Sequence, residues 1–162
     1  VVAEAPALCK HPYGNFVIQH LLEHVSDSRK EALLSRLLAS VPQLAMHRTA
    51  SHVIQRALDY SDEDQRCAII LAFLHAETPS SLLEVACNRY GSFVVEQLAA
   101  LRGPLVDEVR RRLCQGSAAL CRSQFGRRVV PRFGLEAQAV ETAAQAKQQE
   151  PVLREASPRS LG

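Results

Sequence analysis

A flat ring beside two small polar side chains recurs along this chain. One set is Asn15, Phe16 and Gln19, and a later set is Ser92, Phe93 and Glu96. A planar ring can stack on the face of a nucleobase, while an amide or carboxylate forms hydrogen bonds to the edge of that base. These residue types at one repeated spacing favour single-stranded nucleic acid as the ligand.

The polar members of the two sets suit different base edges. Uracil offers carbonyl acceptors and one N–H, which suits the amides of Asn15 and Gln19. The Watson–Crick edge of guanine offers two adjacent donors, which suits the carboxylate of Glu96. Because an unpaired buried donor costs about 1–3 kcal/mol, exchanging glutamine for glutamate between the sets changes which base is satisfied.

Two further sets carry other residues at the same three positions. They are Ser51, His52 and Gln55, then Arg127, Arg128 and Pro131. Proline has no N–H and cannot read a base edge, so the last set is predicted to belong to an end cap. Its two arginines are expected to contact phosphate or to stack on the outer base.

All four sets lie within a longer repeated segment. Its copies are HPYGNFVIQHLLE (11–23), HRTASHVIQRALD (47–59), NRYGSFVVEQLAA (88–100) and SQFGRRVVPRFGL (123–135). Corresponding residues are 36, 41 and 35 positions apart, and the longer middle interval contains the loop-forming sequence HAETPSS. This near-constant spacing predicts a repeat architecture.

Each copy has the pattern of an amphipathic helix. In the first copy the apolar stripe is Val17, Ile18, Leu21, Leu22 and Val25. At 100° per residue, the three ring and edge positions share a patch away from this stripe, so we expect them to face outward. Pro12 suits a first helical turn, and Asn88 and Ser123 are predicted N-caps of their copies.

Further helices are predicted between the copies, at 29–41, 62–76 and 104–114. Ser61 with Asp64 predicts a capping box, and Pro104 fits a first turn. No segment alternates with the period of two that a strand requires. We therefore predict an all-α protein whose helical units bury their faces by stacking into a solenoid.

Composition sets wider bounds on the class of protein. The 162 residues are 47% hydrophobic and 22% charged with a net charge of +2, as in an ordinary globular domain. No apolar run reaches the roughly 20 residues that span a bilayer, and no secretory signal is visible. Five cysteines without a C-x-x-C pair favour a reducing, intracellular compartment. Because the chain begins at Val1, we expect it to be part of a longer protein.

No residue set predicts catalysis, a cofactor or a metal site. His20 and His24 have a spacing that can bind a metal, but no third ligand completes them. The residues that precede each helix body are expected to serve the fold, through close packing at Gly14, Gly91 and Gly126 and through the aromatic residues Tyr13, Tyr90 and Phe125. Contacts to a phosphate backbone are expected instead from Arg48, Arg56, Arg89 and Arg122. The arginines at 110–112 are expected to form a solvated helix face.

The segments HPYGNFVIQHLLEH, SHVIQ, YGSFVVEQ and FGRRVV resemble Pumilio (PUF) repeats, in which each helical repeat reads one RNA base. The resemblance covers residues 1 to about 134 and implies the C-terminal part of a right-handed α-solenoid, an α/α superhelix. Full repeats would lie at about 1–37, 38–75 and 76–113, with a cap at 114–134. A soft helix and a flexible tail are expected over 135–162.

The resemblance also implies a base for each set. Asn15 and Gln19 would select uracil, Ser92 and Glu96 guanine, and Ser51 and Gln55 adenine, with Phe16, Phe93 and His52 as the stacking rings. Because the family binds RNA antiparallel to its repeats, the implied order is 5′-G-A-U-3′. The implied role is cytoplasmic binding of mRNA untranslated regions, with translation or decay controlled through effector proteins.

The sequence is also compatible with two other functions. One is that of a nucleolar Pumilio-like ribosome-biogenesis factor, which binds structured RNA with less regard for sequence. The other is that of a helical scaffold of the HEAT or armadillo kind, which binds protein in a concave groove. A scaffold would not need a ring and two edge-reading groups at one repeated position.

Overall fold

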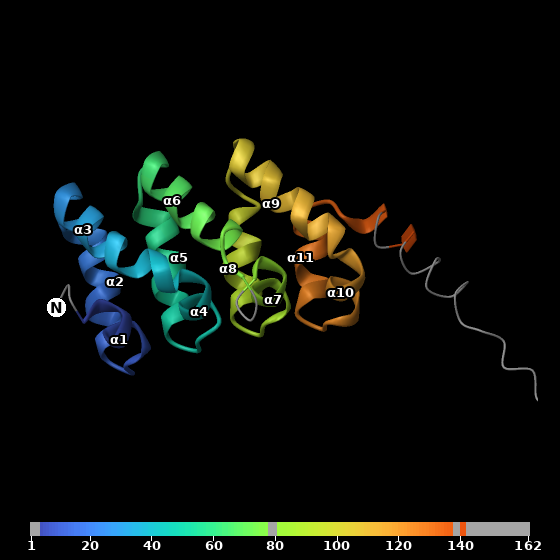
Figure 1. Ribbon diagram of the computed structural model, residues 1–162. Coiled ribbons are helices and arrows are strands. Elements are labelled where there is room, and N and C mark those ends of the chain that lie inside the picture. The colour runs from blue at the N-terminus through green and yellow to red at the C-terminus, as the bar shows by residue number, and fades with distance from the viewer. Residues whose placement is uncertain (1–3, 78–80, 138–139, 142–162) are drawn as a thin grey trace, which may run out of the picture.

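The computed structural model describes residues 4–77, 81–137 and 140–141, which form a row of stacked helices (Figure 1). The first unit contains α1 (Ala5–Lys10), α2 (Gly14–His24) and α3 (Asp27–Leu37). The second contains a 3₁₀ turn, η1 (Leu38–Ser40), and then α4 (Val41–Ala45), α5 (Ala50–Tyr60) and α6 (Glu63–Leu74). The third contains α7 (Leu82–Cys87), α8 (Gly91–Leu98) and α9 (Pro104–Gln115), and a final pair contains α10 (Ser117–Arg122) and α11 (Gly126–Arg132).

The row has three layers of helices. The middle layer consists of α2, α5, α8 and α11, each packed on the next, and we call these the groove helices. The longer helices α3, α6 and α9 lie on one side of them, and the short helices α1, α4, α7 and α10 lie on the other. No strand occurs in the described part of the chain, so the predicted all-helical solenoid is confirmed.

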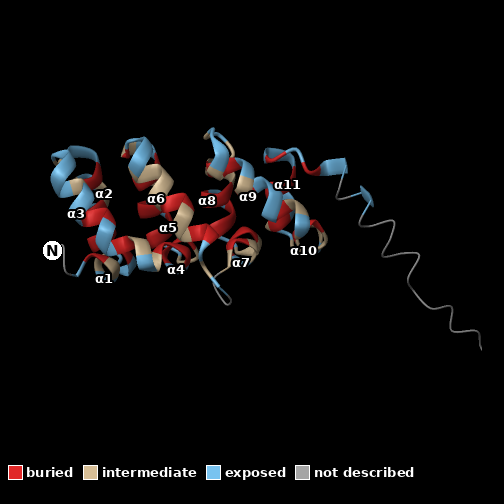
Figure 2. Ribbon diagram, turned by 45° about the horizontal axis from the view of Figure 1, so that its top comes forward, coloured by how far each residue is buried: buried red, intermediate tan, exposed pale blue. Residues whose placement is uncertain are grey.

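The buried residues lie between these layers, while the outer surfaces of α3, α6 and α9 are exposed (Figure 2). Ile18 and Leu22 are fully buried, as the apolar stripe of the first copy predicts. Val17 is not, because its side chain is 51% exposed. The valines at the same place in later copies, Val53, Val94 and Val129, are fully buried. Each of these three valines is on a groove helix that follows another groove helix, whereas α2 is the first groove helix of the described chain and packs mainly on α5.

Each groove helix begins with a turn that is closed by a side-chain acceptor three residues earlier. His11 Nδ1 accepts from the backbone N–H of Tyr13 and Gly14, at 3.2 and 3.0 Å. Asn88 Oδ1 accepts from Tyr90 and Gly91, at 2.8 and 3.1 Å. His47 and Ser123 form the same pair of bonds in their copies. Asn88 and Ser123 were predicted as N-caps, but the N-cap residues are Tyr90 and Phe125, two positions later. The two side chains do accept hydrogen bonds from the turn that leads into each helix.

The predicted capping box of Ser61 and Asp64 is wrong by one residue. The observed box joins Asp62 and Gln65, whose side chains each accept from the other's backbone N–H, at 2.8 and 3.3 Å. Ser61 instead ends α5 in extended conformation, and its hydroxyl is buried without a hydrogen-bond partner. Pro104 does lie in the first turn of α9, as predicted.

Close packing at the glycines is confirmed. A Cβ atom on Gly91 would lie 2.4 Å from the backbone oxygen of Val85, and one on Gly126 would lie 2.7 Å from that of Leu120. The short helices thus press directly on the starts of the groove helices. The long middle interval falls between α6 and α7, and its residues 78–80 lie outside the described part, as does most of the predicted soft helix and tail after residue 135.

Candidate nucleic-acid interface

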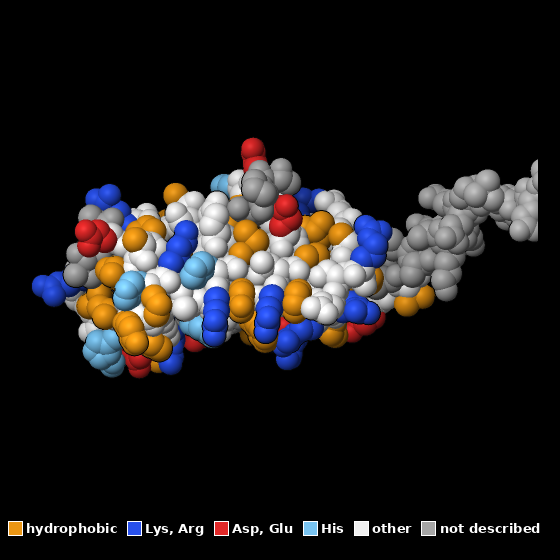
Figure 3. All heavy atoms as spheres, turned by 90° about the horizontal axis from the view of Figure 1, so that it is seen from below, with side chains coloured by type: hydrophobic (Ala, Val, Ile, Leu, Met, Phe, Trp, Pro, Cys, Tyr) orange, Lys and Arg blue, Asp and Glu red, His pale blue; other side chains and the backbone are white. Residues whose placement is uncertain are grey.

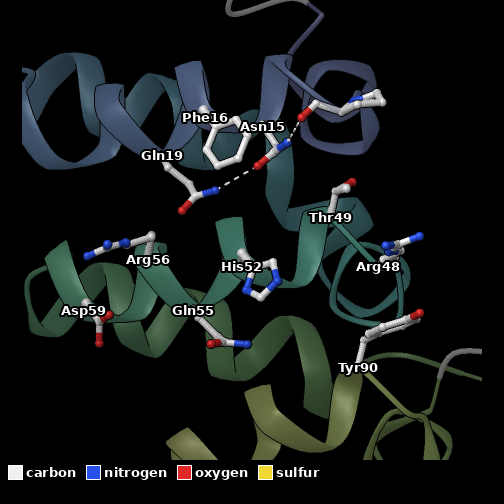
Figure 4. Close-up of a pocket in the computed structure, with 11 residues that line it drawn as sticks. Asn15, Phe16, Gln19, Arg48, Thr49, His52, Gln55, Arg56, Asp59 and Tyr90 are labelled. Carbon is white, nitrogen blue, oxygen red and sulfur yellow. Dashed lines mark hydrogen bonds between the residues drawn. The ribbon is translucent and has the colours of Figure 1, made fainter.

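The rings predicted to stack lie exposed on three successive groove helices. Phe16 is on α2, His52 on α5 and Phe93 on α8. A pocket of about 720 Å³ lies between the first two rings and is lined by Asn15, Gln19 and Gln55 (Figure 4). A second pocket, of about 480 Å³, is lined by His52 and Phe93. Each pocket is thus lined by two of the rings, on which a base can stack.

The first residue of each set is buried rather than outward-facing. Asn15, Ser51 and Ser92 are 3%, 2% and 0% exposed, so the expected outward orientation is wrong for this position. The cause is the capped turn that precedes each helix, to which all three side chains turn back. Asn15 and Ser51 still line the pockets described above, whereas Ser92 does not line either of them.

Asn15 uses both of its N–H groups on this turn. Its Nδ2 donates to the backbone oxygens of His11 and Pro12, at 2.9 and 2.8 Å. Its Oδ1 accepts from Nε2 of Gln19 at 2.9 Å, which orients the partly exposed Gln19 amide toward the pocket (Figure 4). Asn15 therefore positions Gln19, and Gln19 keeps one N–H and its carbonyl oxygen for a ligand.

The second set is held more loosely. The Ser51 hydroxyl reaches only the backbone oxygen of Arg48, at 3.5 Å, and His52 is exposed between the two pockets. The backbone of Gln55 is fixed by Gln97 of α8, which donates to Gln55 O at 3.2 Å and to Asp59 Oδ1 at 2.6 Å. Gln97 thus joins two groove helices just beside the edge-reading positions.

In the third set, Phe93 and Glu96 are in contact with two arginines of the fourth copy, Arg128 and Arg132. The guanidinium of Arg128 lies 4.1 Å from the centre of the Phe93 ring, and its Nε donates to Glu96 Oε1 at 3.0 Å. The other carboxylate oxygen, Oε2, is 3.5 Å from Nε of Arg132. Arg128 was expected near a phosphate or the outer base, and the structure places it on the ring and carboxylate of the preceding unit.

The other residues of the fourth copy do not all lie at the third set as Arg128 does. Arg127 is exposed at the start of α11, and Pro131 is the second-to-last residue of that helix. Arg132, which follows Pro131, was missed by the sequence analysis. The signal that could have found it is its register, because it stands one residue after the edge-reading position, as Gln97 does in the third copy.

Two of the aromatic residues just before the groove helices, expected to serve only the fold, also contribute to the pockets. Tyr90 lines both pockets and Phe125 lines the second, so these rings belong to the groove as well as to the fold. Tyr13 at the same register is 78% exposed, which excludes a core role. The register places Thr49 here in the second copy, where it lines the first pocket.

Several cations border the pockets. Arg48 and Arg56 line the first pocket and Arg89 the second, which suits the backbone contacts expected of them. Arg56 donates to the hydroxyl of Tyr60, which in turn donates to Glu23 at 3.0 Å and so ties α5 to α2. This bond to a carboxylate raises the pKa of Tyr60. Figure 3 views the molecule from the side of the short helices and shows Lys and Arg side chains next to hydrophobic ones in its lower half, with some acidic and His side chains among them.

Among the described residues, no three His, Cys, Asp or Glu side chains come close enough to hold a metal ion. His20 and His24 lie with their ring centres 4.3 Å apart. The arginines at 111 and 112 pair with Glu108 on α9, away from the pockets. In the described part of the chain, every helix falls short of the apolar length needed to cross a bilayer.

Comparison with known proteins gives a family match. The sequence profile of the Pumilio-family RNA binding repeat matches residues 5–38, 40–72 and 81–98. No match is found among curated protein sequences.

Solved structures share the fold. The Puf4 RNA binding domain, bound to the HO endonuclease RNA 3′ UTR recognition sequence, has a TM-score of 0.76 and 18% identity, over 91% of this chain and 47% of that one. The PUM-HD domain of S. pombe Puf1, in complex with RNA, has a TM-score of 0.75 and 20% identity, over 86% and 37%. PUF-8, in complex with PBE-RNA, has a TM-score of 0.68 and 22% identity, over 82% and 39%. The chain spans less than half the length of these three proteins.

Proposed function

Because this chain belongs to the Pumilio family of RNA-binding repeat proteins, we propose that it binds single-stranded RNA with one base against each groove helix. The observation that carries the proposal is the row of rings on α2, α5 and α8 with an open pocket on either side of His52. Stacking on such rings contributes about 1–3 kcal/mol per base.

The proposed base order is 5′-G-A-U-3′, with guanine at Glu96, adenine at Gln55 and uracil at Gln19. Gln19 supports uracil because its free N–H and carbonyl oxygen match an adjacent acceptor and donor of that base. Adenine also presents one donor beside one acceptor, so the fixed orientation of the Gln19 amide is needed for selection. The carboxylate of Glu96 accepts only, and it therefore suits the two donors of guanine.

The biological role that we propose is recognition of mRNA 3′ untranslated regions in the cytoplasm. Its support is the similarity to Puf4, which is bound to a 3′ UTR sequence. Control of translation or decay would then follow from effector proteins recruited to the bound transcript. Three bases give modest affinity, and we expect dissociation constants in roughly the micromolar range for this chain alone.

The test is fluorescence anisotropy with labelled ten-nucleotide RNAs that carry G-A-U within a run of cytidines. Each of the three bases is changed in turn, and a DNA of the same sequence serves as a comparison. We expect the unchanged RNA to bind most tightly and each change to weaken binding by about five- to a hundredfold. Equal binding of all RNAs would contradict sequence-specific recognition, and no binding of any would contradict the proposed function as a whole.

A further inference from the structure

At the third base site, formed by Phe93 and Glu96, side chains of α11 occupy both the ring and the carboxylate. Arg128 lies over the Phe93 ring, with its guanidinium carbon 4.1 Å from the ring centre. Phe93 and Glu96 also line a pocket of about 420 Å³ together with Arg132. Both oxygens of Glu96 are engaged, Oε1 by Arg128 at 3.0 Å and Oε2 by Arg132 at 3.5 Å. The Glu96 side chain is only 13% exposed as a result, while those of the two arginines remain 47% and 66% exposed.

A base cannot stack between Phe93 and Arg128 while Arg128 stays in place. Stacked bases repeat about every 3.4 Å, so a base held between Phe93 and Arg128 needs a gap of roughly twice that distance. The observed separation is that of direct contact between a cation and a ring. The edge of an entering base also has to replace Arg128 at the carboxylate, because Glu96 would otherwise lose a hydrogen-bonded partner.

We propose that Arg128 is a specificity-determining residue, which closes the third base site of the free chain and yields it only to guanine. This inference rests on the proposed function. Guanine brings two donor groups, N1–H and N2–H, to the two carboxylate oxygens, and so replaces what the arginines supply. Adenine, cytosine and uracil each bring one donor group to the same edge. An RNA with one of these bases leaves Arg128 in place, and its base stays outside the site.

The test separates this role from a phosphate contact and from stacking on bound base. Binding is measured for three RNAs that differ only at the third site, which carries guanine, adenine or an abasic nucleotide. The ratio of the guanine and abasic affinities cancels the contribution of the backbone. For the unaltered chain, we expect this ratio to exceed one, and we expect the adenine and abasic RNAs to bind equally.

The variant Arg128→Gln removes the competitor for both Phe93 and Glu96. We expect the guanine-to-abasic ratio to rise by roughly 3- to 30-fold, the combined strength of an exposed cation–ring contact and a surface ion pair. Arg36→Gln makes the same change in charge on α3, outside the groove, and should leave the ratio unchanged. A falling ratio would mean that Arg128 stacks on the bound base. An unchanged ratio, with all RNAs weakened together, would mean a phosphate contact. Either result overturns the proposal.

A second measurement uses the unaltered chain. In nuclear magnetic resonance, the Nε–H signal of Arg128 should be protected from exchange in the free chain and with abasic RNA, and it should lose that protection with guanine RNA. Retained protection with guanine RNA would also overturn the proposal. If the chain binds no RNA at all, the proposed function fails and this inference fails with it. If it binds with base preference and Arg128 shows neither effect, only this inference fails.

Discussion

The side-chain amide of Gln19 donates to that of Asn15, with 2.9 Å between Nε2 and Oδ1. Because Asn15 is itself held by two backbone oxygens, this bond fixes which end of the Gln19 amide faces the pocket. Two residues therefore share the selection of a base at the first site. The buried Asn15 orients the amide of Gln19, and the partly exposed Gln19 contacts the base.

Replacing Asn15 by Ala should remove this orientation while leaving Gln19 and Phe16 in place. We expect the preference for uracil over adenine at the first site to fall by about fivefold, the value of one hydrogen bond of roughly 1 kcal/mol. Anisotropy with the two RNAs measures the ratio. The total affinity of both RNAs can also fall, because Asn15 is buried, but an unchanged ratio would contradict its orienting role.

Replacing Glu96 by Gln should abolish the preference for guanine at the third site. The amide keeps the size of the side chain but offers only one acceptor oxygen, so one guanine donor loses its partner. A bidentate contact to a base contributes about 1–3 kcal/mol of discrimination, which predicts a loss of about 5- to 150-fold in the guanine-to-adenine ratio. A variant that binds the four possible RNAs with the ratios of the unaltered chain would reject the assignment of Glu96.

Replacing Phe16 by Ala should weaken RNA binding without changing stability much, because the ring is 64% exposed. Loss of one stacking platform costs about 1–3 kcal/mol in binding. Val17→Ala is the matched control, since Val17 is 51% exposed on the next position of the same helix and lines neither pocket. Equal RNA affinities for the two variants would show that Phe16 does not stack on a base.

Replacing Gly91 by Ala should destabilise the fold. The added Cβ would lie 2.4 Å from the backbone oxygen of Val85, so α7 and α8 have to move apart, at a cost of about 1–3 kcal/mol. The same change at Gly14 meets its nearest atoms at 3.0 Å and should cost less. Urea unfolding followed by circular dichroism gives both free energies. The order of the two variants is the decisive result, and a greater loss at Gly14 would contradict the packing described here.

Glu108 provides a prediction for acid stability. Its bonds to Arg111 and Arg112 lower the pKa of the carboxyl from 4.5 to about 2. A pKa lowered by folding contributes stability that is complete above about pH 4.5 and is lost as the pH falls toward 2. The difference in unfolding free energy between the unaltered chain and Glu108→Gln should therefore shrink over this interval.

The control for that experiment is Glu31→Gln, which removes an exposed carboxylate on α3. Denaturant titrations at pH 7, 4 and 2.5 follow all three proteins. A difference between the unaltered chain and Glu108→Gln that stays constant across these pH values would contradict the ion pairs on α9.

The helices and the row of rings could be predicted from the sequence, because both depend on local spacing. The burial of Asn15, Ser51 and Ser92 could not. A helical wheel assigns directions to an isolated helix, whereas here a capped turn and a short helix cover each start. The exposure of Val17 has a similar cause, since an identical register is buried only where another unit packs on it.

The contact of Arg128 with Glu96 could not be predicted from the sequence either. The two residues are 32 positions apart and meet through long side chains that cross between α11 and α8. Arg128 stands where the other copies carry a ring, but nothing in its own copy indicates that it contacts Glu96. Their pairing depends on the angle at which neighbouring units stack, and a repeat spacing does not specify that angle.

The turn before each groove helix has one further consequence. The four acceptor side chains are of three types, two imidazoles, an amide and a hydroxyl, yet the helix that follows begins at the same register in each copy. The four acceptors that close the turn are thus distinct from the residues that line the two pockets. The residues that line the pockets can therefore be substituted without changing the turn that sets the start of each helix. A few substitutions at fixed positions should then give new base preferences.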